Sequence, residues 1–292
     1  PHKAVLLLAV ISLIEEGIIQ ENKIGIRPEL VLKFKELFRV LSSNKFTANF
    51  SLPFYHLKSS GFWNLKTNAG REILLTSSAS IKSFAHLKEV IAYASLNDDL
   101  FTLLSDTDSR QILRQTLLTT YFQDGTLKLA EYQPSLFEEV AHQILSDSTI
   151  AYQIQVAQAD EEEIFIRGGV FKKVVPKVYN YSCCISGMRI IGDRDVQMVD
   201  ACHIIPFSES HDDTISNGIS LCPNLHRAFD RHLISIDENY KVHVATGFTE
   251  GQSEYGIKTY AGRSISLPKE IHYQPSRESL ARHFQVFVSK NN

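Results

Sequence analysis

Three polar residues, His203, Asn217 and His226, are separated by 14 and 9 positions in the C-terminal half of the sequence. The residues around them read as a strand at 196–203, a polar loop, a second strand at 219–222 and a short helix from 223 to about 231. A lone histidine is usually a structural residue, but three such residues within one strand–loop–strand–helix order are rarely produced by chance. This pattern constrains the fold more than any other feature of the chain.

Length, composition and charge limit the number of domains and the class of protein. The 292 residues are enough for two domains, and a hydrophobic content of 43% with 22% charged residues is typical of globular proteins. The net charge of −3 means that any surface for nucleic acid must be local. The four cysteines are too few for a disulfide framework, and the adjacent Cys183 and Cys184 would bridge each other only with strain. We therefore expect a reducing, cytoplasmic setting.

The apolar stretch at 4–14 resembles the core of a signal peptide, yet Glu15 and Glu16 follow it without a small-residue cleavage site. At about 11 residues it is too short to span a bilayer. It predicts a buried helix that ends near Gly17, and no membrane association. The first residue is not methionine, so we expect the natural start to lie upstream.

The first half reads as mostly helical. Helices are predicted at 28–41, after Asp108 as an N-cap, and at 135–145, and short strands at 62–65 and 73–75 flank a turn at 68–70. A polar stretch at 147–163 marks a change in composition. We predict an α+β protein with a helical domain at 1–150, a linker at 151–166 and a second domain at 167–292.

Three segments of the second domain resemble the HNH (ββα-metal) endonuclease family: 200–206 (DACHIIP), 216–219 (SNGI) and 221–226 (LCPNLH). The segment 228–237 (AFDRHLISID) resembles the restriction-enzyme branch of that family. The resemblance implies a metal-dependent DNA endonuclease. His203 would be the general base, Asn217 would hold the hairpin or orient His203, and His226 would bind Mg²⁺ or Mn²⁺.

The residue types suit this chemistry. Phosphodiester hydrolysis needs a deprotonated water and a cation that neutralises charge on the scissile phosphate. A neutral histidine is a suitable base near pH 7 because its unperturbed pKa is about 6.5.

The sequence departs from the family pattern in its carboxylate. Many members carry an acidic ligand immediately before the base, where this chain has Cys202, a poor ligand for a hard cation. Asp200 points to the same side of the strand as Cys202 and is our first choice for the metal-binding carboxylate. Asp230, four residues after His226 on the helix, is the second, with a contact at the helix end as the alternative.

Structural zinc is not expected. Family members often hold zinc with two Cys-x-x-Cys pairs, but here Ser186 and Leu225 replace the second cysteine of each pair. Two thiolates do not make a closed tetrahedral site. We therefore expect Cys183 and Cys222 to be buried.

The segments 1–8 (PHKAVLLL), 52–57 (LPFYHL) and 61–63 (GFW) resemble the sulfur-binding domain of McrA-type restriction enzymes, which recognise phosphorothioated DNA. Sulfur is softer and less hydrated than oxygen, so an apolar pocket can favour it. The DNA-binding residues predicted from this resemblance are Pro53, Phe54 and Tyr55 for the pocket, His2 and Lys3 for adjacent phosphates, and His56. The alternative is that Pro53 and Phe54 merely start a helix and that Trp63 belongs to the core. The lone histidines His2, His56, His86 and His283 are interpreted as structural by default.

The leading hypothesis is a modification-dependent restriction endonuclease that acts on double-stranded, phosphorothioated DNA. One alternative is an HNH nuclease that reads methylated or unmodified DNA, and another is a DNA-binding protein with an inactive HNH fold. Cutting both strands with one site per chain would require a homodimer or successive nicks.

Overall fold

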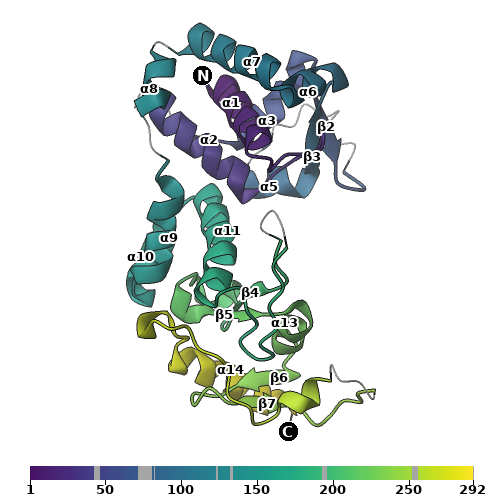
Figure 1. The fold of residues 1–292 in the computed structure, drawn as a ribbon, viewed down its shortest axis with the longest axis vertical. Helices are drawn as coiled ribbons and strands as arrows, with labels where there is room; N and C mark the ends of the chain where they lie inside the picture. The colour runs from purple at the N-terminus through teal and green to yellow at the C-terminus, as the bar shows by residue number, and fades with distance from the viewer. Residues whose placement is uncertain are drawn as a thin grey trace. The chain divides into compact units, whose positions relative to one another are not determined.

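The computed structural model describes residues 1–42, 47–71, 81, 83–122, 124–131, 134–192, 196–251 and 256–291. They form two compact units, one of residues 1–137 with 160–166 and the other of residues 138–159 with 167–292. Both units combine helices with short antiparallel strands, which confirms the α+β class (Figure 1). The predicted linker at 151–166 is largely helical. The predicted domain boundaries stay a prediction.

The first unit is built around α1 (His2–Glu15), which confirms the buried helix. Apolar residues on all sides of α1 suit a central helix, and Gly17, at φ 71°, follows it in a left-handed conformation. The helices that contact α1 are α2 (Pro28–Leu41), α3 (Ser51–His56), α6 (Asp98–Ser105) and α7 (Thr107–Tyr121). Asp106, rather than the predicted Asp108, caps α7, because its carboxylate accepts a hydrogen bond from Ser109 N at 2.9 Å.

A three-stranded antiparallel sheet of order β1–β3–β2 completes this unit. Its strands are β1 (Ile24–Gly25), β2 (Trp63–Thr67) and β3 (Ile91–Leu96). The strand expected at 62–65 corresponds to β2, whereas the one expected at 73–75 lies outside the described residues. The remaining elements are η1 (Leu57–Ser60), α5 (Phe84–Val90) and α8 (Gly125–Glu131).

The second unit contains the strand–loop–strand–helix order expected around the three polar residues. The order is β4 (Asp200–His203), α12 (Phe207–Ser210), η2 (Ile215–Asn217), β5 (Gly218–Leu221) and α13 (Pro223–Asp230). Three helices precede it: α9 (Leu136–Ser146), α10 (Thr149–Gln158) and α11 (Glu161–Val178). After it come β6 (Ile234–Ile236), β7 (Val242–Val244), η3 (Ile257–Tyr260), η4 (Ile271–Tyr273) and α14 (Arg277–Asn291).

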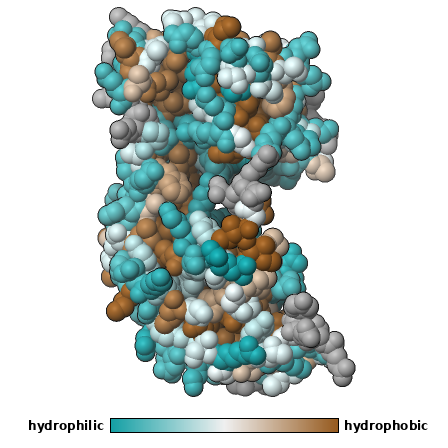
Figure 2. All heavy atoms as spheres, viewed as in Figure 1, coloured by the Kyte–Doolittle hydropathy of each residue, from teal (hydrophilic) through white to brown (hydrophobic). Residues whose placement is uncertain are grey.

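Hydrophilic residues cover much of the visible face of each unit, with hydrophobic residues exposed in separate areas (Figure 2). Within the described ranges, every helix is too short or too polar to cross a bilayer, α1 included.

Candidate active site

The β4–β5 hairpin and α13 bring the predicted site residues together. In the antiparallel register Cys202 lies opposite Ile219 and His203 opposite Gly218. Pro223 begins α13 directly after β5, with a fixed φ that suits the first helical position, and this puts His226 in the first turn. His203, His226 and Asp230 consequently line one pocket of about 370 Å³.

The ring of His203 is held on two sides. Phe171 of α11 stacks on it with a centroid distance of 4.1 Å and an interplanar angle of 9°. Its Nε2 lies 2.7 Å from Oδ1 of Asp213. The side chain keeps 23% of its surface exposed, so the base predicted from the sequence is oriented and also accessible.

Asp213 was missed by the sequence analysis. It lies in the loop between β4 and β5, its side chain is 2% exposed, and Oδ2 accepts a hydrogen bond from the hydroxyl of Tyr152 at 3.3 Å. Tyr152 is fully buried on α10, and burial raises its pKa well above the usual value, so it stays a phenol. An acidic residue between two motif positions was the one available signal for Asp213.

Asn217 holds the loop that joins the two strands. Its side-chain Oδ1 accepts from Ile205 N at 2.9 Å, and its Nδ2 donates to the carbonyl oxygens of Ile205 at 2.9 Å and Asp212 at 3.0 Å. The residue is 1% exposed. Of the two roles left open by the sequence, these contacts fit holding the hairpin, since every acceptor and donor belongs to the loop.

His226 lies between the two candidate carboxylates. Its Nδ1 is 3.3 Å from Oδ2 of Asp200, and its Nε2 is 3.6 Å from Oδ2 of Asp230. One ligand atom each from Cys202, His226 and Asp230 falls within a 4.8 Å span. The thiol of Cys202 is fully buried, and burial together with the carboxylates of Asp230 and Asp200 raises its pKa, so it remains protonated.

Cys183 and Cys222, the remaining cysteines of the two incomplete Cys-x-x-Cys pairs, contact each other. Cys183 is buried as expected, but Cys222 is only half-buried, because it stands at the start of α13. A hydrogen bond between their thiols lowers the pKa of Cys183 and raises that of Cys222. Cys183 Sγ also accepts from Ser186 N at 3.4 Å.

The predicted DNA-binding residues of the first unit divide into two groups. Pro53, Phe54 and Tyr55 are buried, with the Phe54 ring packed between Phe50 and Trp63. These three residues therefore belong to the core, and the apolar pocket expected from them is not open to DNA in this conformation. An apolar motif looks the same in sequence whether it lines a core or a pocket, which explains the difference.

His2, Lys3 and His56 keep exposed surface. His2 is anchored, since its Nε2 lies 3.0 Å from the carbonyl oxygen of Thr47 and its ring is 4.6 Å from that of Phe38. Lys3 Nζ donates to Ser59 Oγ at 3.3 Å.

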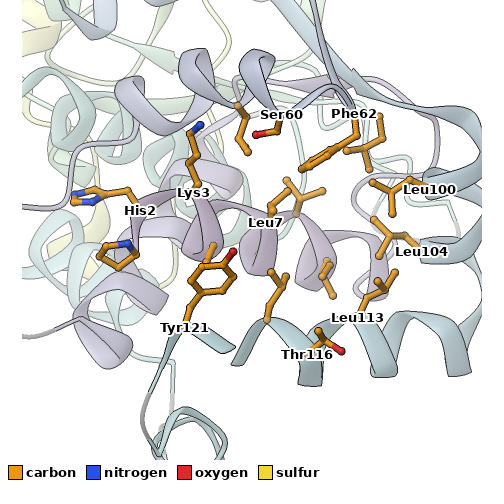
Figure 3. A pocket seen from close by; sticks show the side chains of 17 residues that line it. His2, Lys3, Leu7, Ser60, Phe62, Leu100, Leu104, Leu113, Thr116 and Tyr121 are labelled. Atoms are coloured by element: carbon orange, nitrogen blue, oxygen red, sulfur yellow. The ribbon is translucent and has the colours of Figure 1, made fainter. Parts of the chain in front are cut away.

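His2 and Lys3 border an apolar cavity of about 710 Å³. Figure 3 shows these two residues toward one end of it and Leu100, Leu104 and Leu113 toward the other. Most of its lining residues belong to α1, α6 and α7, and most of the lining is aliphatic. An apolar pocket thus exists beside the predicted phosphate contacts, at a different place from the one expected.

The comparison with protein families finds a match within the second unit. Residues 183–237 match the HNH endonuclease family, and the match includes His203, Asn217 and His226. A solved structure titled modification dependent TagI restriction endonuclease is 21% identical with a TM-score of 0.32, over 40% of this chain and 36% of that one. The chain thus spans about a third of that relative. No curated protein matches. The family match confirms that the chain carries an HNH endonuclease domain.

Proposed function

We propose that the chain is a metal-dependent restriction endonuclease that hydrolyses double-stranded DNA at the pocket shared by His203, His226 and Asp230. One observation carries this proposal: an oriented, accessible imidazole and an imidazole–carboxylate pair line the same pocket. These are the two components that phosphodiester hydrolysis requires.

His203 acts as the general base. A carboxylate can only accept hydrogen bonds, so the contact with Asp213 assigns the ring proton to Nε2. Nδ1 then carries the lone pair and takes a proton from water in the pocket. Asn217 keeps the loop after His203 in place, which fixes the direction of the strand end.

The residues present fit a divalent cation. His226 Nε2 and Asp230 Oδ2 face each other at 3.6 Å, which is too long for a hydrogen bond and leaves room for a shared ion. A histidine ligand commonly donates its other N–H to a carboxylate, and Asp200 lies where it would accept from Nδ1. This supports Asp230 as a ligand and Asp200 as the residue that orients His226, the reverse of the order favoured by the sequence. A bound Mg²⁺ or Mn²⁺ would neutralise charge on the scissile phosphate.

Cleavage of supercoiled plasmid tests the proposal. The parent should nick or linearise DNA with Mg²⁺ or Mn²⁺ and stop with EDTA. His203→Ala should lose roughly 10²–10⁴-fold in rate, the contribution of general base catalysis, while it still binds DNA. A parent that binds DNA and never cuts it, with either ion, would favour an inactive HNH fold. If His203→Ala cut DNA at the parent rate, the assignment of His203 as the general base would be rejected.

We also propose that the first unit reads phosphorothioated DNA. A phosphorothioate combines a negative charge with a weakly hydrated sulfur atom, and Lys3 at the border of an apolar cavity offers a matching cation and apolar surface. A reader of methylated bases would need polar groups for the base edge, and the lining of this cavity is mainly aliphatic.

A further inference from the structure

We propose that Asp213 is a positioning residue for proton abstraction and that Tyr152 of α10 supports it, so that a helix some fifty residues before His203 belongs to the active centre. This inference rests on the proposed nuclease function and names residues that neither the sequence motif nor the family match assigns.

The carboxylate of Asp213 joins the proposed base to a buried tyrosine. Oδ1 faces His203 Nε2 at 2.7 Å, and Oδ2 accepts from the Tyr152 hydroxyl at 3.3 Å. A buried carboxylate is costly unless it is hydrogen-bonded, and these two contacts satisfy Asp213 at 2% exposure.

The loop itself is held by other residues. Asn217 bonds to Ile205 and Asp212, and the carboxylate of Asp212 accepts from Thr214 N at 2.8 Å. The neighbouring aspartates therefore differ in task. Asp212 shapes the loop backbone, whereas the carboxylate of Asp213 is directed at the base.

Asp213 would do three things for His203. It would fix the Nε2–H tautomer, leaving Nδ1 as the proton acceptor. It would hold the ring against Phe171 in the lining of the pocket. It would also stabilise the imidazolium that forms once the proton arrives, as the buried aspartate of a hydrolytic triad does.

Tyr152 holds the Asp213 carboxylate through Oδ2, the oxygen that does not face His203. Its ring is fully buried, and the guanidinium of Arg167 lies 5.0 Å from the ring centroid. On the same helix, Gln153 Nε2 donates to the carbonyl oxygen of Ser210 at 2.7 Å. In Figure 1, α10 lies to the left of α11, which runs toward the β4–β5 hairpin. Residues predicted to be a linker thus brace the loop that carries Asp213.

The test compares Asp213→Asn with Asp212→Asn, the same chemical change one residue away, in single-turnover plasmid cleavage. Asp213→Asn should lower the maximal rate at least about 10²-fold with unchanged DNA affinity, because Asp213 is 2% exposed and does not line the pocket. Asp212→Asn should lower thermal stability more than the rate of the folded protein. Tyr152→Phe removes one hydrogen bond to the Asp213 carboxylate, a long one at 3.3 Å, and should cost about 2- to 10-fold in rate.

A double mutant separates positioning from a structural role. If Asp213 acts through His203, adding Asp213→Asn to His203→Ala should cost no further rate. Equal additional losses in both backgrounds would overturn the proposal. So would Asp213→Asn cutting at the parent rate. A parent that cuts no DNA would overturn the nuclease proposal and this one together, and that result is distinct from the other two.

The tautomer gives a readout that does not depend on cleavage. In ¹⁵N-histidine spectra the His203 signals, assigned by their loss in His203→Ala, should show Nε2–H in the parent. In Asp213→Asn the amide oxygen is expected to stay with the Tyr152 hydroxyl, so its NH₂ faces Nε2 and the ring proton moves to Nδ1. An Nδ1–H tautomer in the parent would overturn the proposal.

Discussion

Nδ1 of His226 lies 3.3 Å from Oδ2 of Asp200, although the two residues are 26 positions apart in the sequence. The hairpin creates this contact, because Asp200 begins β4 and pairs with Leu221, the last residue of β5, two positions before α13 begins. With Nδ1 facing Asp200, Nε2 is the ring nitrogen that faces Asp230. The two carboxylates therefore have different relationships to a cation held by His226, and substitution distinguishes them.

Asp230→Asn should weaken divalent-cation binding more than Asp200→Asn. Under the proposed arrangement the first change removes a direct ligand, whereas the second removes the residue that orients a ligand, a loss that is typically about 10- to 100-fold in affinity. Titration of Mn²⁺ onto the DNA-free protein, followed by electron paramagnetic resonance, measures the affinities without a need for cleavage. Glu270→Gln, an equivalent change at an exposed site, should leave affinity unchanged. The reverse order of losses would put the cation beside Asp200, as the sequence alone favoured.

Gly218→Ala should damage the site through packing. An added Cβ would lie 2.7 Å from Val175 Cγ2 and 3.1 Å from two ring atoms of Phe171, the ring that stacks on His203. We expect a loss of about 1–3 kcal/mol in the free energy of unfolding, together with slower cleavage by the folded fraction. Urea denaturation and plasmid cleavage measure these.

The matched control for this change is Gly168→Ala on α11, where an added Cβ meets nothing within 4 Å. Because alanine favours a helix over glycine, this variant should be as stable as the parent or more stable. Similar losses in the two variants would show that the close approach at Gly218 is unimportant.

The site could be predicted from sequence where its residues follow local rules. His203, Asn217 and His226 are fixed by a short strand–loop–strand–helix order, and hydrogen-bonded pairing of adjacent segments reproduces it. Asp213 and Tyr152 are 61 positions apart and meet only after α10 packs on the loop, so no periodicity reveals them. The burial of Phe54 and Tyr55 could not be predicted for a related reason: whether an apolar side chain lines a core or a cavity depends on packing partners such as Phe50 and Trp63.

Acid should destabilise the protein through His283. This residue is 4% exposed and stacks on Phe229, and burial, with the neighbouring His232, lowers its pKa to about 3. Below the unfolded-state pKa of about 6.5 the unfolded chain binds a proton that the folded protein excludes. The free energy of unfolding should therefore fall as the pH drops from about 6.5 toward 3, by up to about 1.4 kcal/mol per pH unit from this group.

Two variants isolate that contribution in urea unfolding between pH 7 and pH 5. His283→Phe keeps a ring against Phe229 and removes the titrating group, so it should flatten the pH dependence. Ser235→Ala removes the 2.8 Å hydrogen bond between Ser235 Oγ and His283 Nδ1 but keeps the imidazole. It should lower stability at every pH without flattening the curve. An unchanged slope in His283→Phe would contradict the assignment.

Recognition of phosphorothioated DNA by the first unit is tested by paired titrations of two duplexes that differ only in a phosphorothioate. The full chain carries His203→Ala, so that binding is measured without cleavage. Lys3→Ala should lower the affinity for both duplexes by similar factors and reduce the salt dependence of binding, because the lysine side chain would contact either DNA backbone in the same way. Thr116→Phe, which narrows the apolar cavity, should reduce the preference for sulfur more than the overall affinity. Thr119→Phe makes the same change on α7 at a residue outside the cavity lining and should preserve the preference.

Pro53→Ala and Tyr55→Ala alter buried residues, so they should affect folding before they affect discrimination between the two duplexes. Equal affinity of the parent for the two duplexes would reject recognition of sulfur and favour a reader of methylated or unmodified DNA.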